Sequence, residues 1–255
     1  MGSDDRTPRW RHVAITGASS GIGAALARRL AAPGRRLSLA ARDPARLEAV
    51  ADACAAKGAE TSATPLDVTD RAAVAAWLHD AARERSLDLV VCNAGILEEA
   101  GRAPQQVVEV NLLGTMNTMG PAVALMRASG GGRIAVTISL AAFRPQPKTP
   151  AYAASKAAVR IYAESMRPAL RSMGIGLSVV CPGIVATPML EGHRVPERFL
   201  VSADRAAEII ADGLARGRSQ VYFPWVLYTK ARLMAFLPAG LVDRLGAPKA
   251  RPTSA

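Results

Sequence analysis

The stretch His12-Val-Ala-Ile-Thr16, followed at once by Gly17-Ala-Ser-Ser-Gly21-Ile-Gly23, decides the fold of this 255-residue chain. Its first half is a short apolar run, which predicts a buried strand, and the residues from Gly21 onward predict a helix. Glycines between a strand and a helix let the backbone approach a pyrophosphate closely, and the free N–H groups at the helix start attract the anion. We therefore expect a nucleotide-binding turn between the first strand and the first helix.

The rest of the chain continues this alternation of strands and helices. Further strands are predicted at 36–41, 60–66, 88–92, 133–139, 176–181 and 221–223. Helices are predicted at 21–32, 44–57, 71–85, 151–173 and 203–214, and Ser202 is expected to cap the last of them. Because such an order requires right-handed crossovers, it predicts an α/β fold: a single Rossmann-like, doubly wound parallel sheet with helices on both faces. Residues 1–11 form a polar lead, 12–224 the domain with both sites, and 225–255 an apolar and basic extension of that domain.

Composition excludes several other classes of protein. The 32 basic residues exceed the 21 acidic ones and give a net charge of +11. Because the basic residues are scattered along the chain and aromatics make up only 4% of it, nucleic acid is not expected as a partner. The three cysteines and three histidines lack metal-ligand spacing, which predicts no metal site and fits a reducing cytoplasm. No secretory signal and no 18-residue uncharged apolar run is visible, so we expect a cytoplasmic protein.

The glycine spacing, TGxxxGxG rather than GxGxxG, resembles that of the short-chain dehydrogenase/reductase family. Three further segments resemble that family's cofactor-lining segments. They follow the third, fourth and sixth predicted strands and are Asp67-Val68, Asn93-Ala94-Gly95 and Pro182-Gly183, with Thr187 close behind the last. The resemblance covers about residues 12–223 and implies a nicotinamide dinucleotide cofactor. The cofactor-binding residues expected with it are Gly17, Ser19, Ser20, Gly21, Ile22, Gly23, Arg42, Asp67, Val68, Asn93, Ala94, Gly95, Tyr152, Lys156, Pro182, Gly183 and Thr187.

The end of the second strand indicates which dinucleotide is preferred. An acidic residue there would accept hydrogen bonds from the ribose and repel a 2′-phosphate. This chain has Ala41 at that place and then Arg42, whose guanidinium suits a phosphate. Asp43 precedes Pro44 and is expected to cap a helix. We therefore expect NADP(H) to be preferred, with NAD(H) as the alternative.

A tyrosine and a lysine four residues apart, Tyr152 and Lys156, are the candidate proton donor and its partner. Residues with this spacing share one face of a helix. An ammonium group near a phenol stabilises the phenolate, so the lysine is expected to lower the tyrosine pKa from about 10 toward neutrality. None of the other three tyrosines has a lysine at this offset.

The family resemblance supplies two further catalytic candidates. Ser139, at the end of the fifth strand, resembles the serine that hydrogen-bonds the substrate oxygen, although a strand-end serine also commonly caps a turn. Asn111 resembles the family asparagine that bends a helix and holds a water linking the lysine to solvent; a plain kink or cap is the alternative. The implied reaction is hydride transfer between NADP(H) and a carbonyl or secondary alcohol, in which Tyr152 exchanges the proton.

The substrate itself is not fixed by these residues. An apolar carbonyl or alcohol leads, a 3-oxoacyl thioester is the narrower alternative, and a dinucleotide-binding regulator without turnover is the alternative of another class. Residues 221–242 concentrate the few aromatics, and Lys230 and Arg232 interrupt this segment. Its part at 225–242 is expected either to pack on the protein or a partner subunit, or to contact a membrane peripherally. A homodimer or homotetramer is expected.

Overall fold

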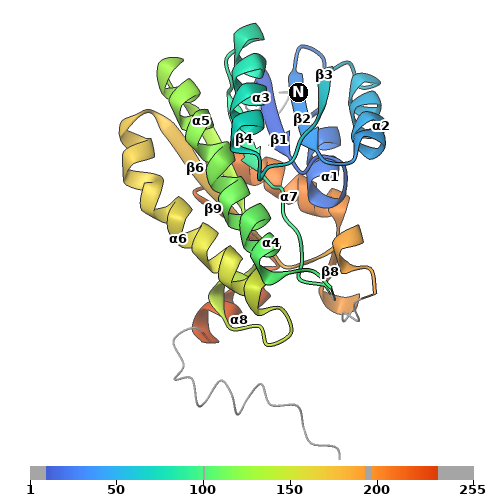
Figure 1. Ribbon diagram of the computed structural model, residues 1–255, viewed down its shortest axis with the longest axis vertical. Coiled ribbons are helices and arrows are strands. Elements are labelled where there is room, and N and C mark those ends of the chain that lie inside the picture. Colours follow the sequence, from blue (N-terminus) through green and yellow to red (C-terminus); the bar gives the residue numbers. More distant parts are fainter. Residues whose placement is uncertain (1–9, 100, 193–196, 235–255) are drawn as a thin grey trace, which may run out of the picture.

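A seven-stranded parallel sheet forms the centre of the computed structural model, which describes residues 10–99, 101–192 and 197–234. The strand order is β3-β2-β1-β4-β5-β6-β9, and helices cover both faces of the sheet (Figure 1). The strands are β1 His12–Thr16, β2 Arg36–Ala41, β3 Glu60–Pro65, β4 Leu89–Cys92, β5 Gly132–Thr137, β6 Ile175–Pro182 and β9 Gln220–Phe223. The predicted Rossmann-like fold is confirmed.

Capping side chains set the starts of several helices, as the sequence predicts. The helices are α1 Gly21–Leu30, α2 Pro44–Ala55, α3 Arg71–Glu84, α4 Pro104–Val108, α5 Gly114–Ala128, α6 Pro150–Ser172, α7 Ala203–Ala215 and α8 Trp225–Met234. Asp43 caps α2 by accepting a hydrogen bond from the backbone N–H of Arg46 at 3.0 Å, and Ser202 caps α7 in the same way from Arg205 at 3.1 Å. Such a cap typically stabilises a helix by about 1 kcal/mol.

The sheet separates two apolar cores. Val13 and Ile15 of β1 pack with α1, α2 and α7 on one face, whereas Ala14 between them packs with α3, α5 and α6 on the other. Because successive side chains of a strand point to opposite faces, one strand contributes to both cores. Burial on both faces explains the nearly continuous apolar runs of strands such as β1 and β4.

Several predicted boundaries shift by one or two residues. β5 ends at Thr137, so Ser139 does not end the strand but starts a 3₁₀ turn over Leu140–Phe143, whose N-cap it forms. β6 extends through Pro182, which therefore belongs to the strand and does not follow it. Pairing with β9 at the register Pro182↔Phe223 carries the strand that far.

Two structural units were not predicted. The first is a helical segment in which α4, a π turn over Glu109–Leu113 and α5 follow one another directly. Pro104 and Pro121, with glycines between them, interrupt the helical periodicity of this segment, so no helix was predicted. Pro104 is nevertheless compatible with α4, because it stands in the first turn, where a proline costs no hydrogen bond. The second is a two-stranded parallel sheet of β7 Ile184–Ala186 and β8 Leu200–Ser202, each strand too short for a sequence signal.

The C-terminal helix α8 packs beside the turn that follows Ser139. The ring of Tyr228 stacks on Tyr222 with 4.0 Å between centroids and meets Phe143 edge-on at 5.4 Å. Trp225 remains 68% exposed, and Leu233 64%. The predicted segment 225–242 continues beyond the described residues. Among the helices that are described, none combines the length and the apolar character needed to cross a membrane.

Candidate active site

A cavity of about 530 Å³ opens where the strand order reverses, at the carboxyl ends of β1 and β4. Ligands of doubly wound sheets bind at this point. The predicted site residues that line the cavity are Gly17, Ser19, Ser20, Gly21, Ile22, Arg42, Asp67, Val68, Asn93, Ala94, Gly95, Ser139, Tyr152, Lys156, Pro182, Gly183 and Thr187. Gly23 and Asn111 are buried behind the wall. Seven separate segments of the chain thus meet at one place.

The glycine turn is shaped for close approach to a ligand. Gly17 has a φ of +67°, and a Cβ on it would lie 2.7 Å from the Cα of Ala94. A Cβ on Gly23 would lie 2.2 Å from the carbonyl oxygen of Gly17. Ser20, the N-cap of α1, makes no capping hydrogen bond with its side chain. The N–H groups of the first helical turn are therefore directed at the cavity without a side-chain partner, which suits a pyrophosphate.

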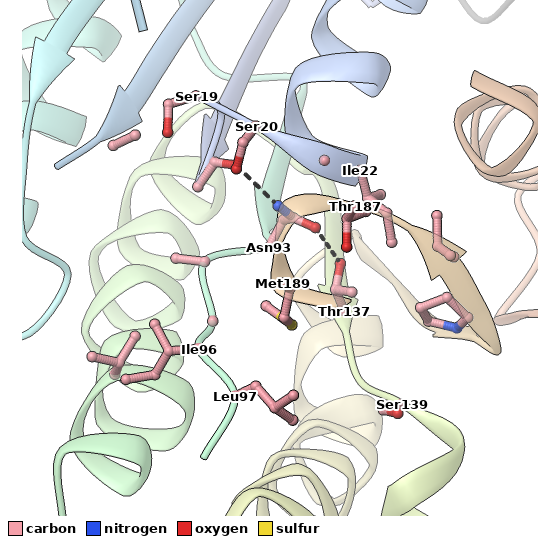
Figure 2. Close-up of a pocket in the computed structure, with 18 of the residues that line it drawn as sticks. Ser19, Ser20, Ile22, Asn93, Ile96, Leu97, Thr137, Ser139, Thr187 and Met189 are labelled. Carbon is pink, nitrogen blue, oxygen red and sulfur yellow. Dashed lines mark hydrogen bonds between the residues drawn. The ribbon is translucent and has the colours of Figure 1, made fainter. Parts of the chain in front are cut away.

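Asn93 holds this turn against the neighbouring strands. Its side-chain amide donates to the carbonyl oxygen of Gly17 at 3.3 Å, and its carbonyl accepts from the hydroxyl of Thr137 at 3.3 Å (Figure 2). Its backbone N–H donates to the hydroxyl of Thr16 at 3.1 Å. Neither threonine was predicted as a site residue; Thr16 could have been found as the last residue of its predicted strand, whereas Thr137 ends a strand that was predicted to run to residue 139.

Two guanidinium groups face the cavity at the end of β2. Arg42 is exposed there beside Ala41, and Arg46, one helical turn along α2, also lines the wall. The carboxylate of Asp43 is occupied by the α2 cap and by the guanidinium of Arg46, whose Nε lies 3.3 Å away. Arg46 was not singled out from the sequence, although its spacing of four from Arg42 was visible. At this strand end the carboxylate of Asp43 is thus engaged with its own helix, whereas Arg42 faces the cavity.

Tyr152 lies in the first turn of α6, and its side chain and that of Ser139 line the same cavity. Burial raises the pKa of Tyr152, and the Ser139 side chain, as a hydrogen-bond partner for the phenolate, partly opposes that rise. The predicted lowering of this pKa by Lys156 is wrong for the geometry found: the Nζ of Lys156 lies 5.9 Å from the ring centroid and donates instead to the carbonyl oxygen of Thr137 at 3.1 Å. The phenol is therefore protonated at neutral pH.

Lys156 is itself buried, with 4% of its surface exposed. Burial lowers its pKa from 10.5 to about 8, because the ammonium loses most of its hydration. Gly95 makes room for it, since a Cβ on Gly95 would lie 3.2 Å from the Nζ. A buried ammonium beside the cavity is costly to the fold, which is typical of a functional position.

Asn111 lies within the π turn between α4 and α5, the irregularity of a helix expected from its resemblance. Its side-chain oxygen accepts from the N–H of Ile96 at 2.8 Å, and its amide donates to the carbonyl of Ile96 at 3.0 Å and to the hydroxyl of Ser155 at 3.0 Å. Ser155 in turn donates to the carbonyl oxygen of Tyr152 at 2.8 Å. Asn111 thus joins the loop after β4 to the helix of Tyr152 and Lys156. Ser155, inside the Tyr152–Lys156 segment, was not recognised from the sequence.

The two ends of the cavity differ in charge. Arg42, Arg46 and Asp67 belong to segments that follow β2 and β3 on one side of the switch point. The other end, beside β5 and β6, carries apolar side chains and the Ser139 hydroxyl; Figure 2 shows Ile96, Leu97 and Ser139 at the end away from Ser19 and Ser20. The apolar lining there comprises Ile96, Leu97, Ile138, Ile184, Val185, Met189 and Leu190. A search of the described residues finds no group of His, Cys, Asp or Glu suited to a metal.

Known proteins are similar to this chain in sequence and in fold. Residues 11–197 match the protein family described as short chain dehydrogenase. A 1-deoxy-11-beta-hydroxypentalenate dehydrogenase of Streptomyces exfoliatus is 34% identical over 83% of this chain and 82% of its own. A short chain dehydrogenase of Burkholderia cenocepacia in complex with NADP has a TM-score of 0.79 at 26% identity over 94% of this chain and 98% of its own. One of Burkholderia phymatum in complex with NAD has the same TM-score and identity over 96% and 98%.

Proposed function

The chain belongs to the short-chain dehydrogenase/reductase family, and on that premise we propose that it transfers a hydride between NADP(H) and an apolar carbonyl compound or secondary alcohol. The observation that supports this most is that Tyr152 and Ser139 line the same cavity as the glycine turn. Two hydroxyl groups at the apolar end are the pair that a carbonyl oxygen requires: one to polarise it and one to protonate it.

The proposed division of work follows from these contacts. The bound dinucleotide supplies or accepts the hydride. Ser139 donates a hydrogen bond to the substrate oxygen, and Tyr152 transfers the proton to it during reduction or takes it up during oxidation. Because burial raises the pKa of Tyr152, the phenol carries its proton at neutral pH, which favours reduction.

Lys156 and Asn111 serve the same proton transfer in this proposal. With a pKa near 8, Lys156 is mostly cationic at neutral pH, and its ammonium can bind the nicotinamide ribose. Asn111 holds the segment around Ile96 and Ser155 in place and borders the route by which the proton is replaced from solvent. The remaining predicted cofactor residues are proposed to bind the dinucleotide along the cavity wall.

NADP(H) is the proposed preference because the end of β2 offers the guanidinium groups of Arg42 and Arg46, while the carboxylate of Asp43 is engaged with its own helix. A charge-assisted hydrogen bond to a phosphate contributes about 1.5–3 kcal/mol, or about 10- to 100-fold in affinity. Arg42→Ala should therefore raise the KM for NADPH by that factor and leave the KM for NADH unchanged. Arg29→Ala removes a similar exposed charge on α1 outside the cavity wall and is the matched control. An unchanged KM for NADPH in the Arg42 variant would refute the preference.

An apolar substrate is proposed because, among the described residues that line the β5 and β6 end of the cavity, Lys156 alone carries a charge. The experiment is a panel of carbonyls followed by NADPH absorbance, with apolar ketones, a keto acid and a 3-oxoacyl thioester at equal concentration. Apolar ketones should be reduced with the highest kcat/KM. Faster turnover of the thioester or the keto acid would overturn the substrate class, and no turnover of any would favour a binding protein.

Self-association and membrane contact stay predictions for the C-terminal region. Trp225, Val226 and Leu233 are exposed on α8, which also carries Lys230, and this composition suits either a subunit contact or an anionic lipid surface. Analytical ultracentrifugation tests the homodimer or homotetramer. Co-sedimentation with anionic vesicles, for the full chain and for Trp225→Ser, tests the membrane contact.

A further inference from the structure

We propose that Glu98 is the residue that positions Tyr152 for proton transfer, an inference that rests on the proposed function. One carboxylate oxygen of Glu98 accepts hydrogen bonds from the backbone N–H groups of Ala151 at 2.8 Å and of Tyr152 at 3.4 Å. Glu98 comes from the loop after β4, more than fifty residues earlier in the chain. It acts on the backbone of Tyr152 and does not line the cavity.

Helix α6 needs a cap from elsewhere because its own sequence provides none. Thr149 occupies the N-cap position without a capping hydrogen bond, and Pro150 has no N–H to satisfy. The next two N–H groups, those of Ala151 and Tyr152, donate their hydrogen bonds to the carboxylate of Glu98. A carboxylate at this end also interacts favourably with the helix dipole. The cap of the helix that carries Tyr152 is therefore supplied by a residue distant in sequence.

The loop that carries Glu98 is the loop that lines the proposed dinucleotide site. At its start, Asn93 is bonded to the glycine turn, and in its middle, Ile96 is bonded on both backbone groups to Asn111. Glu98 then bonds the first turn of α6. One short segment therefore holds the glycine turn on one side and the start of α6 on the other. It thereby sets the position of the Tyr152 phenol relative to the proposed dinucleotide site.

Both backbone groups of Tyr152 are held by side chains. Glu98 accepts from its N–H, and Ser155 donates to its carbonyl oxygen at 2.8 Å while Asn111 donates to Ser155 at 3.0 Å. Farther along, α6 is held by buried apolar residues such as Val159 and Ala163. Loss of the Glu98 contact would therefore loosen only the first turn, where the phenol is attached. A misplacement of about 1 Å can cost about 100-fold in rate.

The test compares three variants of the full chain. Glu98→Ala removes the acceptor, Glu98→Gln keeps an acceptor oxygen, and Glu99→Ala is the matched control, because Glu99 is an exposed neighbour bonded only to Arg102 among the contacts described for it. We measure kcat and KM with NADPH and a ketone, the Kd for NADPH, and deuterium exchange of the peptide containing residues 150–156.

Glu98→Ala should lower kcat about 10- to 100-fold with the Kd for NADPH within about twofold of the parent, and should speed exchange at the start of α6. Glu98→Gln should keep kcat within about threefold, and Glu99→Ala should match the parent. A normal kcat in Glu98→Ala despite faster exchange would reduce Glu98 to a plain helix cap and overturn the proposal. An equal loss in Glu98→Gln and Glu98→Ala would overturn it too. Failure of the proposed function is distinguishable, since Tyr152→Phe would then retain turnover.

Discussion

Replacing Lys156 by methionine should make the protein more stable at neutral pH and inactive. The lowering of the Lys156 pKa from 10.5 to about 8 corresponds to about 3 kcal/mol of unfolding free energy lost to burial of the charge. The variant also loses the hydrogen bond to the Thr137 carbonyl, worth about 1 kcal/mol. Methionine is similar in length and apolar, so the net gain expected is about 2 kcal/mol.

The pH dependence of this gain identifies its cause. Below pH 8, Lys156 is protonated in both the folded and the unfolded chain, and the full penalty is present. Between pH 8 and 10.5 the folded chain binds fewer protons than the unfolded chain, so the parent gains stability relative to the variant as the pH rises. The difference between the two should therefore narrow by about 2 kcal/mol from pH 7 to pH 10.

Urea denaturation of the dinucleotide-free protein at pH 7 and pH 10 measures both quantities, since a bound ligand would mask them. Lys57→Met is the matched control: this exposed lysine also donates one hydrogen bond to a backbone carbonyl, that of Arg28 at 2.8 Å. The control should show neither the gain nor the pH dependence. A variant Lys156→Met that is less stable than the parent at pH 7, or a difference that is equal at both pH values, would refute the reasoning.

Three further predictions concern Ser139, His12 and Gly23. Ser139→Ala should lower kcat about 100-fold and move the pH profile of alcohol oxidation upward, because the lost hydrogen bond had lowered the Tyr152 pKa; an unshifted profile would contradict this. Burial lowers the pKa of His12 below 6.5, so the parent should lose up to about 1.4 kcal/mol per pH unit below pH 6.5 in urea denaturation, a loss absent in His12→Asn. Gly23→Ala places a Cβ 2.2 Å from the Gly17 carbonyl and should destabilise the fold by about 1–3 kcal/mol and weaken NADPH binding measured by fluorescence; unchanged binding would contradict a close approach.

The sequence was sufficient for the fold because its signals were local. Continuous apolar runs marked the strands buried on both faces, and Asp43 and Ser202 stand at the helix caps where their side chains predicted them. The segment from α4 to α5 was missed because prolines and a π turn at Asn111 interrupt the 3.6-residue period. Tertiary packing maintains helix there where the local pattern does not predict it.

The candidate site was predictable as a set of residues but not as an electrostatic arrangement. The residue types and spacing of Tyr152 and Lys156 were visible, and the structure brings both to one cavity. The direction of the Tyr152 pKa was wrong, because burial and the orientation of the ammonium toward Thr137 depend on the whole fold. Glu98 carried no local signal, since a carboxylate that caps a helix fifty residues later is defined only by the tertiary structure.

The most direct measurement of the central claim is single-turnover hydride transfer from NADPH to an apolar ketone by the parent and by Tyr152→Phe. Tyr162→Phe is the matched control, since Tyr162 lies on the same helix and packs against the core. The account predicts a rate at least about 100-fold lower for Tyr152→Phe, with the Kd for NADPH unchanged and the control equal to the parent. A Tyr152→Phe variant that transfers hydride at the parental rate would contradict the account.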